Sequence, residues 1–163
     1  MATQEFSRSL PMLLYRALDT VMPRFRRIFN EFGLTEQQWR VLRVLWEHDD
    51  IAFHALAEAT LIPPPSLVGV VDRLSKSGLV ARRRSESDRR NVSVLATSKG
   101  HALEIKVRPL VEEAYAELRA TVDTREWKQL LEGLDRLGSI EDNENKSLRA
   151  DGTRRRQQVT NDE

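Results

Sequence analysis

The chain contains no cysteine among its 163 residues. This absence excludes disulfide bonds, zinc sites built from cysteine and regulation by thiol oxidation. Long apolar runs are also missing: none approaches the roughly 18 residues that span a bilayer. The first residues lack the basic-then-apolar order of a signal peptide. We therefore expect a cytoplasmic protein that makes no contact with a membrane.

An excess of charge of one sign is missing too, because 26 Lys and Arg residues face 25 Asp and Glu residues. The net charge therefore does not reveal a polyanionic partner, although the distribution of the charges does. No glycine-rich phosphate loop, nucleophile elbow or pair of carboxylates stands out, so we expect no enzyme. The spacing of His48, His54 and His101 gives no compact ligand pair. We accordingly predict no metal site and no cofactor.

Basic residues gather between Leu79 and Ala96, where two short β-prone runs flank a charged tip. The segment holds only two acidic residues but five arginines: Arg82, Arg83, Arg84, Arg89 and Arg90. Guanidinium groups neutralise phosphates or enter a narrow, negative minor groove. A segment of helix length, Pro64 to Ser77, precedes this hairpin and ends at Gly78. A helix followed by a basic hairpin is the order of a winged helix-turn-helix, and it predicts a DNA-binding regulator.

The N-terminal half shows a helical pattern from Leu10 to Glu31, with apolar residues three or four apart. Pro23 predicts a kink in it, and Gly33 suits the left-handed residue that ends it. Thr35 and Gln38 have the spacing of a capping box and open a second helix. A bridging strand at residues 51–53 and a short helix at residues 54–60 follow. Pro64 then begins the next helix, whose expected inward face is Leu67, Val70, Val71 and Leu74.

In the C-terminal half, Thr97 is expected to cap a long helix whose apolar stripe is interrupted by Pro109. Asp123 with Glu126 is expected to open a last helix. These two helices and the first one carry apolar stripes too long for a small winged helix to cover. We expect the stripes to cover one another and those of a second copy.

The predicted fold is mainly α with a small β wing. A winged helix-turn-helix DNA-binding lobe occupies residues 34–98, and a helical dimerisation layer occupies residues 1–33 and 99–140. Residues 141–163 have almost no apolar side chains, so we predict a disordered tail.

Five short motifs occur in order: Leu56-Ala57-Glu58, Asp72-Arg73-Leu74, Gly78-Leu79-Val80, Asp88-Arg89-Arg90 and Thr97-x-x-Gly100. Over residues 10–140 the chain resembles the MarR family of bacterial transcriptional regulators. More narrowly, residues 9–14 (SLPMLL) and 33–43 (GLTEQQWRVLR) resemble the branch that regulates homoprotocatechuate (4-hydroxyphenylacetate) degradation.

The resemblance implies a homodimer on a pseudopalindromic operator in double-stranded DNA. Pro64 to Ser77 would be the recognition helix in the major groove, and Arg82 to Val92 the wing at the minor groove. A small aromatic carboxylate would bind where the dimer layer meets the DNA-binding lobe and weaken DNA binding.

The predicted DNA contacts are Pro65, Ser66, Val68, Gly69, Arg73, Arg82, Arg84, Asp88, Arg89 and Arg90. The recognition helix departs from the family pattern, because Pro63 fills the usual cap position and Val68 and Gly69 replace polar or longer residues. We expect Ser66 and Arg73 to carry the direct readout, helped by contact of Pro65 or Val68 with thymine methyl groups.

Each arginine also has an interpretation without DNA. Arg90 is expected in the minor groove with Asp88 holding its side chain, the alternative being a solvated hairpin tip. Arg82 to Arg84 alternate in direction on a strand, so about half of them contact phosphate and the others are merely exposed. Arg73 contacts DNA or pairs with wing carboxylates.

Arg16 is the first candidate for the effector site, because a guanidinium holds a carboxylate in two-pronged fashion on an otherwise apolar helix that also carries Met12. The alternative is an ion pair with Asp19 or simple exposure. Weaker candidates for the same site are Trp39, Arg40, Arg43 and His54.

The predicted function is a repressor of an aromatic-compound catabolic operon that an aromatic carboxylate releases from its operator. Two alternatives stay open. One is a winged-helix module for contact between proteins, and the other is a regulator of a different pathway controlled by a metal or another ligand.

Overall fold

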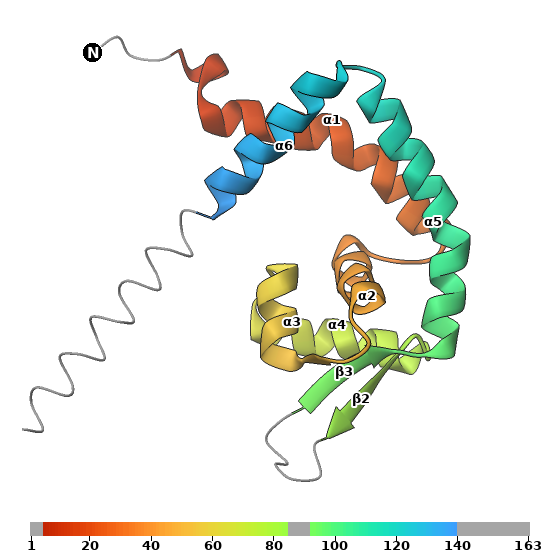
Figure 1. Cartoon of the computed structure of the whole chain (residues 1–163). Helices are drawn as coiled ribbons and strands as arrows, with labels where there is room; N and C mark the ends of the chain where they lie inside the picture. The colour runs from red at the N-terminus through yellow and green to blue at the C-terminus, as the bar shows by residue number, and fades with distance from the viewer. Residues whose placement is uncertain (1–4, 85–91, 140–163) are drawn as a thin grey trace, which may run out of the picture. The chain divides into compact units, whose positions relative to one another are not determined.

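The computed structural model describes residues 5–84 and 92–139 (Figure 1). The elements within them are a short 3-10 helix at Phe6–Arg8, then α1 (Leu10–Glu31), α2 (Glu36–Glu47), β1 (Ile51–Ala52), α3 (Phe53–Thr60), α4 (Pro64–Lys76), β2 (Val80–Arg84), β3 (Val92–Ala96), α5 (Ser98–Arg119) and α6 (Thr124–Gly138). The prediction of a mainly α fold with a small β wing is confirmed.

The wing belongs to an antiparallel sheet in which the strands lie in the order β1-β3-β2. Ile51 of β1 lies opposite Val94 of β3, and the β2–β3 ladder runs from Val80 opposite Ala96 to Arg84 opposite Val92. The predicted bridging strand is therefore the two-residue β1. The predicted tip contacts Asp88, Arg89 and Arg90 lie outside the described residues, as does the predicted tail.

The core of the winged helix lies between α2, α3, α4 and the sheet, which Figure 1 shows gathered together. The inward face predicted for the recognition helix is confirmed, since its members are completely buried: Leu67, Val70, Val71 and Leu74. Helices α2 and α3 contribute Leu42 and Leu56 to the same core, and β3 contributes Val94. An apolar stripe with the period of a helix thus fixes which side of α4 faces outward.

The ends of the helices follow the local sequence. Helix α1 runs through Pro23, and Gly33 after it has a φ of 66°. At the start of α2, the Gln38 amide donates to the Thr35 hydroxyl over 3.2 Å, and the Thr35 amide donates to the Gln38 side chain over 2.9 Å. Asp123 and Glu126 form the same reciprocal capping box at the start of α6. The predictions for Gly33 and for the two capping boxes are confirmed, whereas the kink at Pro23 stays a prediction.

The turn between α3 and α4 contains a feature that the sequence patterns did not indicate. Leu61 has a left-handed backbone with a φ of 52°, which is uncommon for a residue other than glycine. Its amide donates to Glu58 O, and the amide of Ile62 donates to Ala57 O over 3.2 Å. Ile62 is buried, so the left-handed residue turns the chain and anchors it in the core at the entry to α4.

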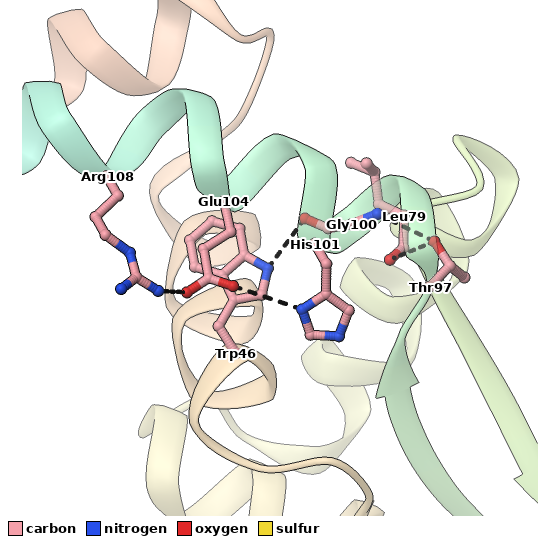
Figure 2. Close-up of polar contacts among 7 residues, drawn as sticks. All are labelled: Trp46, Leu79, Thr97, Gly100, His101, Glu104 and Arg108. Atoms are coloured by element: carbon pink, nitrogen blue, oxygen red, sulfur yellow. Dashed lines mark hydrogen bonds and ion pairs between the residues drawn. The ribbon is translucent and has the colours of Figure 1, made fainter.

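The start of α5 is locked to the winged helix. The Thr97 hydroxyl accepts from the Gly100 amide over 3.1 Å and donates to Gly78 O over 2.7 Å. The indole N–H of Trp46 on α2 donates to Gly100 O over 3.1 Å. Figure 2 shows the indole of Trp46 and the hydroxyl of Thr97 meeting at the first turn of α5. Three elements are therefore joined at one point.

In the next turns of α5, the Glu104 carboxylate contacts two basic side chains of the same helix. Glu104 pairs with Arg108, and its other oxygen lies 3.5 Å from His101 Nδ1 (Figure 2). The Glu104 side chain is largely covered, whereas His101 and Arg108 are exposed. Pairs of this spacing support a helix from its own surface.

The chain forms two compact units, residues 1–116 and 117–163. The first contains the winged helix, α1 and most of α5. The described part of the second contains the end of α5 and α6, on which several large apolar side chains are exposed: Leu130, Leu131, Leu134 and Leu137. None of the described helices is long and apolar enough to cross a membrane.

Gly100→Ala tests the close contact at the start of α5. A Cβ on Gly100 would lie 2.3 Å from the backbone oxygen of Leu79, a distance that forces backbone to move. We expect the free energy of unfolding, measured by urea denaturation, to fall by about 3 kcal/mol, the upper end of the usual cost of overpacking. The matched change Ser98→Ala, at the exposed first residue of the same helix, should stay within about 0.5 kcal/mol of the parent. Equal stability of the two variants would contradict the contact.

Candidate nucleic-acid interface and effector site

The outward face of α4 lies opposite its buried stripe. Pro65, Ser66 and Arg73 are exposed on it, Val68 is 44% exposed and Gly69 is half-buried. All five are predicted recognition-helix contacts, and the structure brings them together on one helix beside the wing. Arg73 and Lys76 add two cations in the last turn.

The first turn of α4 has no free N–H group. Pro63 is the N-cap residue and makes no side-chain cap, and Pro64 and Pro65 have no N–H to donate. The amides of Ser66 and Leu67 both donate to Pro63 O, over 2.9 and 3.0 Å. A helix of ordinary sequence offers several unpaired N–H groups at this point, which makes it a ready site for phosphate. Here that site is absent.

Arg82 ties the wing to the recognition helix. Its guanidinium lies 2.7 Å from the Asp72 carboxylate and 3.3 Å from Val68 O, both on α4. This pair has its carboxylate on the helix and its arginine on the wing. The alternative pairing of Arg73 with carboxylates of the wing stays a prediction, because those carboxylates, Glu86 and Asp88, lie outside the described residues.

Arg83 forms a second ion pair on the wing. Its guanidinium lies 2.8 Å from the carboxylate of Asp50, which immediately precedes β1. Because β1 and β2 flank β3, this pair spans the sheet. Arg82 and Arg83 thus contact different elements, as the predicted alternation along a strand requires. Arg84 ends β2, and its side chain lies outside the described part of the chain.

Neither Asp50 nor Asp72 was singled out as a wing partner from the sequence. For Asp72 a signal existed, because it lies on α4 just before the basic hairpin. For Asp50 the separation of 33 residues from Arg83 left no local signal.

Arg73 lies along its own helix. A Cβ built on Gly69 would come 3.5 Å from Arg73 Nη1, so the guanidinium lies over the glycine one turn before it. Ser77 immediately follows α4, and its backbone oxygen accepts a hydrogen bond from Lys99 Nζ on α5 over 2.7 Å. The Lys99 ammonium is thereby held at the end of the recognition helix.

A row of aromatic rings connects α5, α1 and α2. Tyr115 lies 5.0 Å from Phe25, and Phe25 lies 6.4 Å from Phe29, measured between ring centroids. Phe29 stacks on Trp39 at 4.6 Å, and the edge of Trp39 meets Trp46 at 5.4 Å. Tyr115 could not be predicted as part of this row, since an isolated tyrosine on a long helix gives no motif.

The predicted effector residues are distributed over three helices. On α2, the Arg40 guanidinium donates to Thr60 O over 3.0 Å, and its Nε is buried without a partner. Arg43, one turn after Trp39, pairs with Glu47 over 2.6 Å and remains half-exposed. Met12 and Arg16 lie on α1, and His54 is exposed on α3. Only Trp39 of this set belongs to the aromatic row.

The Arg16–Asp19 pair considered as an alternative is not among the ion pairs of the described residues; both side chains are exposed on α1. Within residues 5–84 and 92–139, no three His, Asp or Glu side chains form a group able to hold a metal ion.

The family model described as MarR matches residues 34–92, which run from the start of α2 to the start of β3. The regulator FarR of Neisseria gonorrhoeae is 35% identical over 142 residues, covering 87% of this chain and 97% of its own. The homoprotocatechuate degradative operon repressor of Escherichia coli is 37% identical over 122 residues, covering 75% of this chain and 82% of its own. The chain belongs to the MarR family.

Solved structures of MarR-type regulators agree. NadR in complex with 4-hydroxyphenylacetate is 34% identical, with a TM-score of 0.74 over 86% of this chain and 99% of its own. The repressor CouR bound to a 23-mer DNA duplex is 28% identical, with a TM-score of 0.77 over 85% of this chain and 98% of its own. The family resemblance inferred from the motifs, and the narrower resemblance to the homoprotocatechuate branch, are confirmed. This MarR-family chain is a transcriptional regulator, not an enzyme.

A double-mutant cycle tests the tie between wing and recognition helix. Asp72→Asn and Arg82→Gln should each destabilise the protein, and the double variant should lose less than their sum. We expect a coupling of about 0.5–1 kcal/mol in urea denaturation, because both side chains are partly solvated. The looser pair Lys128–Glu132, with 3.8 Å between the charged atoms, is the control and should couple by about 0.3 kcal/mol or less. Additive effects of Asp72 and Arg82 would show that the contact contributes nothing.

Proposed function

We propose that this MarR-family protein is a homodimeric repressor of an aromatic-compound catabolic operon, released from its operator by an aromatic carboxylate. The observation that carries the proposal is its similarity to two proteins linked to such compounds. One represses the homoprotocatechuate degradative operon and is 37% identical; the other, 34% identical, was solved with 4-hydroxyphenylacetate.

On DNA, the outward face of α4 enters the major groove and the wing reaches the minor groove. The α4 contacts are Pro65, Ser66, Val68, Gly69 and Arg73, and the wing contacts are Arg82, Arg84, Asp88, Arg89 and Arg90. A guanidinium has five N–H donors, so Arg82 can hold Asp72 and still donate to a phosphate. The ion pair then sets the direction from which the wing approaches the backbone.

The dimerisation layer comprises residues 1–33 and 99–140, and the DNA-binding lobe comprises residues 34–98. Support comes from apolar side chains that are exposed in the single chain, Leu10, Leu13 and Leu18 on α1 and the four leucines on α6. Burial of one such side chain contributes about 1.5–3 kcal/mol, so a few of them offset much of the cost of association. A two-fold axis places the recognition helices about 34 Å apart, one turn of DNA.

The effector site is formed by Met12, Arg16, Trp39, Arg40, Arg43 and His54. Trp39 presents an aromatic ring, and Arg43 follows it by one helical turn on the same face of α2. The pair between Arg43 and Glu47 is exposed and therefore weak, so the carboxylate of a ligand can replace Glu47 at the guanidinium.

Release from DNA follows from a small change in the spacing of the two recognition helices, since both must engage successive major grooves at once. The effector shifts the population toward the form with the wrong spacing. To move the equilibrium from almost fully bound to almost fully released, it must prefer that form by about 5.5 kcal/mol.

Arg90→Ala tests the wing. We expect operator affinity to fall at least tenfold, and the slope of log K against log salt to become shallower by about 0.9 for the lost phosphate contact. Fluorescence anisotropy at several salt concentrations measures both. The control is Lys128→Ala, which removes an exposed cation from α6. Unchanged affinity in Arg90→Ala would remove this residue from the interface.

Arg16→Ala tests the effector site. We expect operator affinity to stay within about twofold and the effector concentration needed for release to rise at least tenfold, because one charge-assisted contact to the carboxylate is lost. Arg27→Ala, which removes another exposed arginine of α1, is the control. If Arg16→Ala is released by the same effector concentration as the parent protein, a residue other than Arg16 binds the carboxylate of the effector.

The function as a whole is tested by binding to the DNA upstream of the protein's own gene, with and without homoprotocatechuate and related aromatic acids. Specific binding that one of these acids abolishes is the expected result. If the protein binds this DNA specifically and none of the acids affects the binding, the proposal of a repressor stands and the proposal of an aromatic carboxylate effector is rejected. Absence of specific binding at low salt would reject the repressor in favour of a module for contact between proteins.

A further inference from the structure

The outward face of α4 has few groups able to form hydrogen bonds with base edges. Its first turn has no free N–H, because prolines occupy positions 63–65 and the next two amides donate to Pro63 O. Among the side chains of its first two turns, Pro65 and Val68 are apolar and exposed and Gly69 has no side chain. Ser66 alone supplies an exposed hydroxyl there. Readout in this part of the helix therefore depends on apolar contact.

Gly69 has no structural role inside the protein. It lies in the middle of a helix, where glycine is less stable than alanine, and it does not have the left-handed backbone that favours glycine. A Cβ added to it would meet only the end of the flexible Arg73 side chain, at the ordinary contact distance of 3.5 Å. The missing side chain leaves the flexible end of Arg73 as the group that covers the α4 backbone here, so a partner reaches this backbone when Arg73 moves aside.

Duplex DNA is the partner that fits this face. The apolar surface is bordered by Arg73 and Lys76 in the last turn of α4, and by Arg82, whose guanidinium lies against Val68 O and pairs with Asp72. Cations beside such a surface attract the phosphates that line a groove. In the major groove, the one apolar group that a base presents is the C5-methyl of thymine, whereas guanine and cytosine present only acceptors and donors.

We propose that the first two turns of α4 recognise thymine methyl groups, with Pro65 and Val68 beside them. The missing side chain at Gly69 allows the close approach once the flexible Arg73 guanidinium, which lies over this residue in the free protein, turns toward a phosphate. Each operator half-site then carries thymines, not G·C pairs, beneath this part of the helix. A G·C pair there has no methyl group for the two apolar side chains to contact. This inference rests on the proposed DNA-binding function and names the base chemistry that the site reads.

The test replaces thymine by uracil in the operator, one position at a time. Uracil keeps every hydrogen-bonding group and removes only the methyl. We expect a loss of affinity of about fourfold for each thymine beneath Pro65, Val68 or Gly69, as burial of one methyl-sized group predicts. Thymines outside the footprint of α4 provide the control and should show no change.

Two variants assign the effect to the helix. In Val68→Ala the ratio of affinities for thymine and uracil should fall toward one at a single position of each half-site. Gly69→Ala should raise the melting temperature and yet weaken operator binding at least tenfold, a combination that a purely structural glycine would not give. Ser75→Ala, another exposed residue of α4, should change neither property.

The outcomes separate this inference from the proposed function. Specific operator binding that survives uracil throughout the α4 footprint would overturn thymine recognition and leave the repressor intact. Normal operator binding by Gly69→Ala would overturn the close approach of the backbone. Absence of any specific operator binding would overturn the proposed function and this inference together.

Discussion

The contact at the first turn of α5 is the constraint on which the arrangement of the first unit depends. Gly100 lies so close to Leu79 O that no other residue has room for its Cβ. At the same turn, the Thr97 hydroxyl accepts a hydrogen bond from the Gly100 amide, and the Trp46 indole donates one to Gly100 O. Thr97 follows β3, and Trp46 lies on α2. The wing, the core helix and the long helix are therefore held together by backbone proximity, which tolerates almost no adjustment.

This constraint gives α5 a physical role in coupling. Its first turn touches the DNA-binding lobe, and Tyr115 on the same helix begins the aromatic row that reaches Trp39 on α2. Helix α5 therefore contacts both the DNA-binding lobe and the aromatic row that contains Trp39, a residue of the proposed effector site. The proposed effector residues Trp39 and Arg43 lie on α2, the other helix that meets this junction.

The arginines of the wing form ion pairs within the protein as well as supplying positive charge. Arg82 and Arg83 each hold a carboxylate of another element, so part of the positive charge predicted to face DNA is neutralised within the protein. Pairs this exposed add little to stability. The Arg82 pair joins β2 to α4, and the Arg83 pair joins β2 to the residue before β1. The first two turns of the recognition helix have few polar groups, and its cations lie in the last turn.

Many local features of this structure could be predicted from the sequence. The capping boxes at Thr35 and Asp123, the left-handed Gly33 and the buried stripe of α4 depend on residues close together in the chain, and all were predicted. The pairs Asp50–Arg83 and Asp72–Arg82, the left-handed Leu61 and the Phe25–Tyr115 contact were not. The sequence by itself determined the helices, the wing and the family, because short-range periodicity and capping specify them. Only the tertiary structure decided which carboxylate holds which arginine and which rings meet, because the partners lie on different elements and the sequence pattern does not specify how these elements pack.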